Sequence, residues 1–160
     1  MRDMDRKLQL LACALAAAGL AAAAACSTAS DDAAAAAAEM TADGITRFQS
    51  EHGIGPVTAP VTVGAAVDQG MAESGAKVFE QKCAPCHRMG ERYVGPALGG
   101  VTTRRSPTFV MNMILNPQGM VEKHPLTKKL FAEYLMAMPN QNLTRDEARQ
   151  VVEYLRAQKP

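Results

Sequence analysis

The sequence has no tryptophan, and all its aromatic residues together make up only 4% of its 160 residues. A domain with so few large side chains has little material for a core, so a bulky bound group would fill what is missing. Neither sign of charge dominates. The net charge is +1, and without residues 1–25, which hold three basic and two acidic side chains, the remainder is formally neutral. This balance excludes the basic footprint of a nucleic-acid-binding protein.

Cysteine is also scarce, with four in the chain, of which Cys13 and Cys26 lie near the N-terminus. A structural zinc site needs four ligands, and a thioredoxin-like dithiol belongs to a βαβ pattern that is absent here. Cys83, Cys86 and His87 form the pentapeptide CAPCH, the attachment motif of c-type haem. The spacing lets one helical turn bring both thiols to the two vinyl groups, and the histidine then binds the iron. We predict one covalent haem c.

The first 25 residues are similar to a secretory signal peptide, because residues 1–7 are charged and residues 8–25 are almost entirely apolar. Cys26 follows a run of alanines, residues 21–25, and stands where a bacterial lipoprotein is cut and acylated, although the usual Leu or Val three positions earlier is absent. Cys13 has a better local sequence, but the apolar stretch before it is too short for export. Ordinary cleavage after Ala-x-Ala and an uncleaved anchor stay open. We expect a periplasmic protein attached to the membrane through Cys26.

The composition divides the remaining chain into three parts. Residues 26–44 are small and rich in alanine, which predicts a tether. Residues 45–69 contain repeated glycine and proline, which predicts an extended segment packed on the domain, with His52 at the surface. Residues 70–160 have helical periodicity and form the predicted haem domain.

Within that domain, Gly75, Phe79 and Cys83 lie four apart and share one helical face, so a helix beginning near Met71 leads to the haem. Gly75 would let another helix approach closely, and Tyr154 is expected to meet it there. A second helix begins at residues 106–107 (SP) and is expected to end at position 117. A third is expected over about 126–136. The last begins at a capping box made by residues 144 and 147.

The loop over residues 88–105 contains candidates for holding the haem and its ligand. A carbonyl in the turn at residues 95–98 (GPAL) would accept the Nδ1–H of His87 and fix its tautomer. Tyr93, Arg104 and Arg105 are candidates for contacts with the haem propionates, although simple exposure explains the arginines equally well.

Taken in order, these motifs resemble the class I c-type cytochromes that carry one haem. The resemblance implies an all-α fold of about four helices around the haem, with the first and last helices crossing. It also implies electron transfer, with His87 and a methionine as the iron ligands. The matching residues are Gly75, Phe79, Cys83, Cys86, His87, Gly95, Pro96, Leu98, Met138, Pro139, Val151 and Tyr154.

Met138 is the expected distal iron ligand, because it lies in a proline-terminated loop between a helix and a capped helix. Met136 is its nearest rival. Met120 lies in a predicted loop without that helix–loop–helix setting. Met111 and Met113 lie inside a helix whose apolar face needs filling, so core packing is their expected role.

A narrower resemblance, over residues 52–158, is to the monohaem cytochromes associated with bacterial nitrous oxide reductase gene clusters. It rests on residues 52–57 (HGIGPV), 91–98 (ERYVGPAL), 112–117 (NMILNP) and 141–144 (QNLT). It implies an electron carrier, not an enzyme, between a quinol-oxidising membrane complex and a periplasmic reductase or oxidase. Two alternatives stay open: a gas-binding, sensing or peroxidase-like haem with a labile distal ligand, and an assembly lipoprotein that binds metal through its dithiol.

Overall fold

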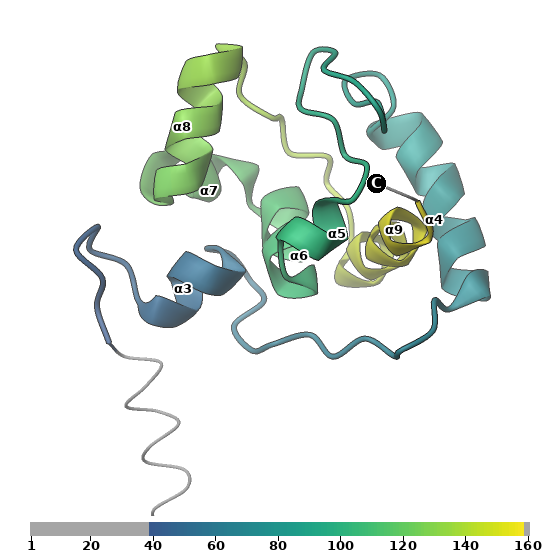
Figure 1. The fold of residues 1–160 in the computed structure, drawn as a ribbon, viewed down its shortest axis with the longest axis horizontal. Coiled ribbons are helices and arrows are strands. Elements are labelled where there is room, and N and C mark those ends of the chain that lie inside the picture. Colours follow the sequence, from purple (N-terminus) through teal and green to yellow (C-terminus); the bar gives the residue numbers. More distant parts are fainter. Residues whose placement is uncertain (1–38, 159–160) are drawn as a thin grey trace, which may run out of the picture. The chain divides into compact units, whose positions relative to one another are not determined.

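The computed structural model describes residues 39–158, and the expected signal peptide, Cys13, Cys26 and most of the tether lie outside the described residues. Apart from one isolated bridge between Met40 and Thr46, the regular secondary structure of this part is helical (Figure 1). The helices are α3 (Arg47–His52), α4 (Gln69–Lys82), α5 (Val101–Arg104), α6 (Pro107–Leu115), α7 (Pro117–Lys123), α8 (Pro125–Tyr134) and α9 (Arg145–Ala157). The all-α fold class is confirmed for residues 39–158.

In the described part of the chain, no helix combines the length and the apolar composition that crossing a membrane requires.

Helices α4 and α9 cross and form the most extensive helix pair of the described residues (Figure 1). Their close approach depends on Gly75, because a Cβ atom there would overlap the backbone carbonyl of Gln150. Beside this crossing the rings of Phe79 and Tyr154 pack with their centroids 5.0 Å apart. The predicted crossing and both of its aromatic residues are therefore found. The crossing fixes the end of α4, where the haem-attachment motif begins.

The N-terminus of α9 has the predicted capping box. The backbone N–H of Glu147 donates to the Thr144 hydroxyl at 3.2 Å, and the Thr144 N–H donates to Oε2 of Glu147 at 2.7 Å. The Thr144 hydroxyl also donates to Oε2 at 2.9 Å, and the two hydrogen bonds from Thr144 to the carboxylate lower the pKa of Glu147. The box ends the irregular segment that precedes α9, so it fixes where Met138's loop rejoins the helical core.

Helix α9 also carries a buried carboxylate, Glu153, which helps to hold the segment that precedes α4. Burial raises the pKa of Glu153, but hydrogen bonds and charges from Arg149 and Arg156 outweigh burial and hold it below its usual range. Glu153 accepts a 3.3 Å hydrogen bond from the N–H of Asp68, and Arg156 donates to the carbonyl of Gly64. The residues just before α4 are thus tied to α9.

The segment predicted to be extended over residues 45–69 contains helix α3, which the glycine and proline content concealed. Thr46 and Gln49 form a second capping box that starts this helix. The stretch after it lies along α6, where the fully buried side chain of Asn112 holds it. The Asn112 amide donates to the carbonyls of His52 and Val57 and accepts the N–H of Val57, all at 3.0 Å.

The sequence suggested that His52 is a surface residue, and the structure corrects this prediction. Its Nδ1 lies 2.9 Å from the hydroxyl of Ser106, which also accepts the N–H of Phe109 and caps α6. The side chain is half-buried. The chain that follows His52 is closely packed, because a Cβ atom at Gly53 or Gly55 would crowd the side chains of Met120 or Asn112. This packing gives His52 a rigid setting.

The chain between α6 and α8 corrects the predicted helix ends. Pro117 does not lead into a loop but occupies the first position of α7, with Asn116 as N-cap accepting the N–H of Gly119 at 3.3 Å. Met120 is fully buried in this helix, and its sulfur accepts the N–H of Ile54 at 3.0 Å. The short helix α5 was also not expected. Helix α8 ends before the predicted position 136, because Leu135 adopts a left-handed φ of 52°.

Candidate functional site

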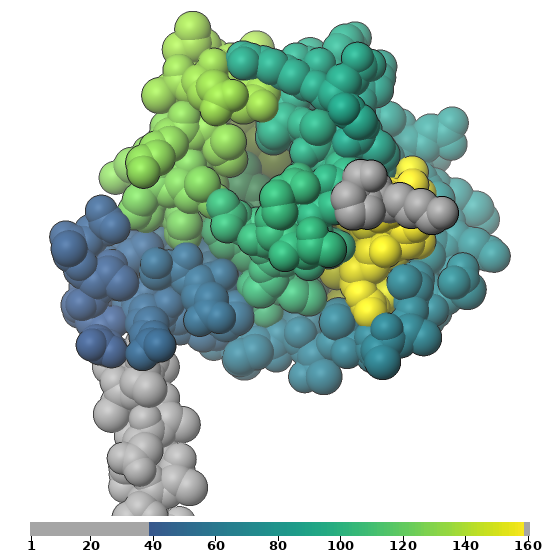
Figure 2. Space-filling view, viewed as in Figure 1, coloured from purple at the N-terminus to yellow at the C-terminus, as the bar shows by residue number. Residues whose placement is uncertain are grey.

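A cavity of about 290 Å³ lies inside the fold, lined mainly by apolar side chains from every described helix except α3. Figure 2 shows the surface hollowed at this place. We call the end of α4 together with residues 83–98 the proximal wall, and α8 together with residues 135–141 the distal wall. Between the two walls, α6 contributes Val110, Met113 and Ile114, and α9 contributes Val151 and Leu155. The cavity is therefore enclosed by segments that are far apart in the sequence.

The proximal wall carries the two cysteines on a tight turn. Cys83 ends α4, with its N–H bonded to the carbonyl of Phe79 at 2.8 Å. The N–H groups of Cys86 and His87 then both donate to the carbonyl of Cys83, at 3.0 and 2.9 Å. All three side chains of the CxxCH motif line the cavity, as the spacing predicted.

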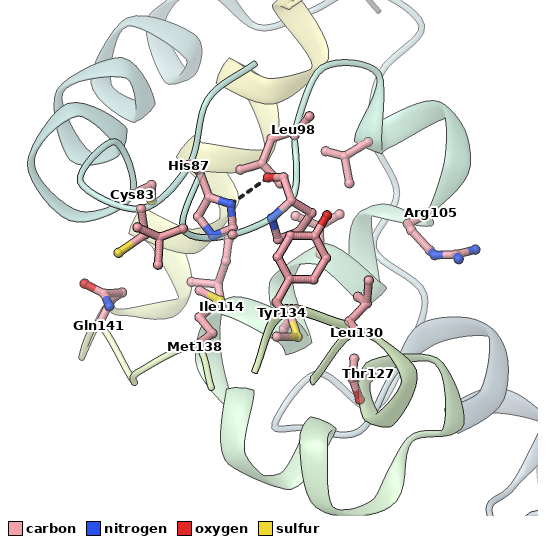
Figure 3. Close-up of a pocket in the computed structure, with 18 of the residues that line it drawn as sticks. Cys83, His87, Leu98, Arg105, Ile114, Thr127, Leu130, Tyr134, Met138 and Gln141 are labelled. Carbon is pink, nitrogen blue, oxygen red and sulfur yellow. Dashed lines mark hydrogen bonds between the residues drawn. The ribbon is translucent and has the colours of Figure 1, made fainter. Parts of the chain in front are cut away.

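His87 is held from behind by the turn that the sequence singled out. Its Nδ1–H donates to the carbonyl of Pro96 at 2.9 Å, shown by the dashed line in Figure 3. Gly95 lies against the ring, where a Cβ atom would come within 2.5 Å of the ring carbon Cε1. The Gly95 N–H in turn donates to the carbonyl of Cys86 at 2.8 Å. Because Nδ1 is occupied, Nε2 is the nitrogen left to bind iron.

Three methionines line the cavity, and two of them come from the distal wall. Met138 is half-buried and enters from the segment opposite His87 (Figure 3), whereas the side chain of Met136 is 58% exposed. Met113 reaches the cavity from α6, so it does more than fill the core. Met111 and Met120 are buried elsewhere in the helical packing and do not line the cavity.

The chemistry of the two thiols fits attachment to a macrocycle better than the competing uses. Burial, with a smaller contribution from the neighbouring Cys86, raises the pKa of the Cys83 thiol to about 11. A reactive dithiol needs a lowered pKa. Over residues 39–158, no three His, Cys, Asp or Glu side chains gather as a metal site would need. An apolar cavity with two thiols and one oriented imidazole suits haem c, and Cys83, Cys86, His87 and Met138 would hold it.

Charged residues meet the cavity at the end near α5. Arg104 and Arg105 both line it, which keeps them as candidates for holding the haem propionates. Arg104 donates to the carbonyl of Gly99 at 2.7 Å, and Arg105 lies over the ring of Phe109. Tyr93 does not line the cavity. It is exposed and lies under the guanidinium of Arg88, so the cavity geometry adds no support for a propionate contact by Tyr93.

Sequence reasoning missed two polar residues at the distal wall, Tyr134 and Gln141, which line the cavity. It also missed Arg92, which reaches from the proximal wall to Tyr134. The separation of these two residues in the sequence is 42 positions, and no local motif marks such a contact.

Comparisons with known proteins agree with this geometry. The family model described as cytochrome c matches residues 72–159. A curated "Cytochrome c-553-like" protein of Synechocystis sp. is 35% identical over 51 residues, which are 31% of this chain and 49% of that protein. The chain thus matches about half the length of this curated relative. Among solved structures, the cytochrome c from Rhodothermus marinus is 42% identical, with a TM-score of 0.64, covering 68% of this chain and 92% of that one. An engineered form of it gives the same identity and TM-score.

Proposed function

Since this chain belongs to the cytochrome c family and carries covalently bound haem c, we propose that it transfers single electrons between partner proteins and is not an enzyme. The observation that carries the proposal is the pair of ligand side chains on opposite walls of one cavity. His87 is oriented by Pro96 on the proximal wall, and Met138 enters from the distal wall. His87 and Met138 together would fill both axial positions of the iron, which would leave no position for a substrate.

When bound, haem supplies one-electron chemistry at the iron, and the protein determines how that chemistry is used. The bond from His87 to the Pro96 carbonyl makes the imidazole more basic and fixes its direction. The apolar cavity walls exclude water from the ligands, and a methionine ligand raises the reduction potential. His87 and Met138 would hold the iron in both oxidation states, so electron transfer would require neither side chain to move away.

The surface around the cavity mouth suits brief docking. Among the described residues, five of the large apolar side chains that are exposed lie on or beside it. Val94, Phe131 and Met136 line the cavity, and Tyr93 and Leu135 are their sequence neighbours. With no net charge on residues 26–160, electrostatic steering contributes little to association. We therefore infer docking through this apolar rim, with the small contact area typical of transient redox complexes.

We further propose that the donor is a quinol-oxidising membrane complex and the acceptor a periplasmic reductase, with nitrous oxide reductase favoured. The support is the narrower resemblance over residues 52–158, and an oxidase is the alternative acceptor. In stopped-flow mixing, the reduced protein should reduce oxidised nitrous oxide reductase at least as fast as it reduces a terminal oxidase. The rate should change little between low and high salt. Much faster transfer to the oxidase would reject this acceptor while leaving the carrier role intact.

Periplasmic location and attachment through an acylated Cys26 are part of the proposal, supported by the apolar stretch over residues 8–25 and the position of this cysteine. Each buried acyl CH₂ contributes about 0.8 kcal/mol, so several chains hold a protein on the membrane almost permanently. The Cys26→Ala variant should appear as soluble holoprotein or as uncleaved precursor, whereas Cys13→Ala should stay in the membrane fraction. Mass spectrometry showing an unmodified mature N-terminus at another position would contradict the anchor.

A further inference from the structure

The distal wall is anchored at one end of α8 and loosely held at the other. At the N-terminal end, His124 and Thr127 are buried, with 4% and 1% of their surface exposed. The His124 Nε2–H donates to the carbonyl of Ser50 in α3 at 3.1 Å, and its Nδ1 accepts the N–H of Leu126. The Thr127 hydroxyl donates to the carbonyl of Met120 in α7 and, at 3.0 Å, to the carbonyl of His124. These contacts join this end of α8 to α3 and α7.

Toward its C-terminal end, α8 has no buried residue like Thr127 among the described residues. The helix packs mainly against α7, and Figure 1 shows the pair standing apart from the crossed helices α4 and α9. Leu135, which does not line the cavity, is 80% exposed. The residues that follow, 135–144, contain no helix or strand up to the start of α9, and Met138 lies among them. The position of Met138 therefore depends on what holds this end.

Arg92 of the proximal wall makes that contact. Its guanidinium carbon lies 4.1 Å from the centre of the Tyr134 ring, and Nη2 donates to the backbone carbonyl of Glu133 at 3.1 Å. Nη1 lies 3.6 Å from Oε1 of Glu133. The last carbonyls of a helix lack partners within the helix and carry the negative end of its dipole, so a cation is well placed there. One side chain of the proximal wall thus contacts the C-terminal end of α8 in the distal wall.

Leu135, which follows Tyr134, has a strained backbone conformation, so the Arg92 contact matters more for the position of the residues that come next. Leu135 has φ of 52°, a left-handed conformation that a residue with a Cβ atom rarely adopts. Such a conformation persists only where the surrounding structure imposes it. Leu135 itself is too exposed to be held by packing, so the fixed residues are those just before it. The strain and the methionine ligand are three positions apart.

We propose that Arg92 is a positioning residue that holds the distal wall against the proximal wall and so keeps Met138 on the iron. The proposal rests on the proposed function, because it takes Met138 as the distal ligand. Without the contact, the C-terminal end of α8 swings outward about its anchored N-terminal end more often. An external ligand then replaces Met138 more readily, although His87 and both thioether bonds are untouched.

The test measures how fast imidazole binds to the oxidised holoprotein. Arg92→Leu should speed binding about tenfold, or about 1.4 kcal/mol, from the loss of one exposed cation–π contact and one surface ion pair. Arg88→Leu is the matched control. Arg88 lies 4.2 Å from the centre of the Tyr93 ring and donates to the carbonyls of Ala84 and His87, so its contacts stay within the proximal wall. Its rate should stay within about twofold of the wild type.

Two further measurements support or overturn the proposal even if Arg92→Leu yields no holoprotein. Arg92→Lys keeps the charge but loses the planar stack on Tyr134, so imidazole should bind to it faster than to the wild type but more slowly than to Arg92→Leu. Salt should speed imidazole binding to the wild type, because it screens an exposed ion pair. Equal rates in the wild type and the Arg92 variants, or equal acceleration by Arg88→Leu, would overturn the proposal. If the wild type lacks the sulfur-to-iron absorption band, the Met138 assignment fails instead.

Discussion

Replacing Cys83 and Cys86 together by alanine is expected to remove all covalent haem and to prevent most of the chain from reaching a stable fold. The two thiols are the proposed thioether donors on the proximal wall, and the cavity between the walls is lined mainly by apolar side chains. With 4% aromatic residues, the chain has few large side chains of its own to fill that space. A cavity that loses its occupant also loses the contacts that the lining atoms made with it.

The measurement is a haem stain after denaturing gel electrophoresis, combined with circular dichroism of the purified chain. Each single variant should keep at most one thioether and give a much lower yield of holoprotein. Cys26→Ala is the control, because it removes a cysteine outside the motif and should keep the stain. Double-variant protein that still carries haem through the gel would show that these cysteines are not the attachment site.

Replacing Met138 by alanine is expected to abolish the sulfur-to-iron charge-transfer band of the oxidised protein. The reduction potential should fall by on the order of 0.1 V, since axial ligands set haem potentials over a range of about 0.8 V. The reduced protein should then bind carbon monoxide at the vacated position. Alanine is smaller than methionine and offers no donor atom, so it cannot restore the ligand.

Met136→Ala and Met113→Ala are the matched controls, because both residues also line the cavity. Met136 lies two positions from Met138 but is more exposed, and Met113 enters from α6. Each control should retain the band and a potential close to that of the wild type. A band that survives in Met138→Ala and disappears in Met136→Ala would move the distal ligand to the neighbouring position.

The features predictable from the sequence are those in which a few neighbouring residues determine the geometry. The CxxCH spacing places both thiols and the imidazole on one turn, and Pro96 lies at the right distance along the chain to accept the His87 Nδ1–H. The Thr144 capping box defines the start of α9. Gly75 identifies the helix crossing, because only a residue without a Cβ atom permits that approach.

The features that were missed depend on contacts between distant segments or on a choice between two local roles. Pro117 suits either the end of one helix or the first position of the next, and the Asn116 side chain decides for the second. His52 appeared exposed because its partner, Ser106, lies 54 residues away. Arg92 gave no signal at all, since a bridging arginine looks like any charged loop residue until the fold brings its partner close.

The structure also bears on the alternative of a gas-binding or peroxidase-like haem. A loosely held C-terminal end of α8 and the strained Leu135 would favour a labile distal ligand. Against this, Met138 lines the cavity, and Arg92 of the proximal wall contacts Tyr134 of the distal wall. The two functions differ in one property of the native protein, which is whether the sixth iron position is filled.

Optical spectra of the purified native holoprotein, oxidised and then reduced under carbon monoxide, test the central claim most directly. An electron carrier with His87 and Met138 on the iron should show the sulfur-to-iron band when oxidised. Once reduced, its low-spin spectrum should not change when carbon monoxide is added. Immediate formation of a carbon monoxide complex by the native reduced protein, or an oxidised spectrum without that band, would contradict the account.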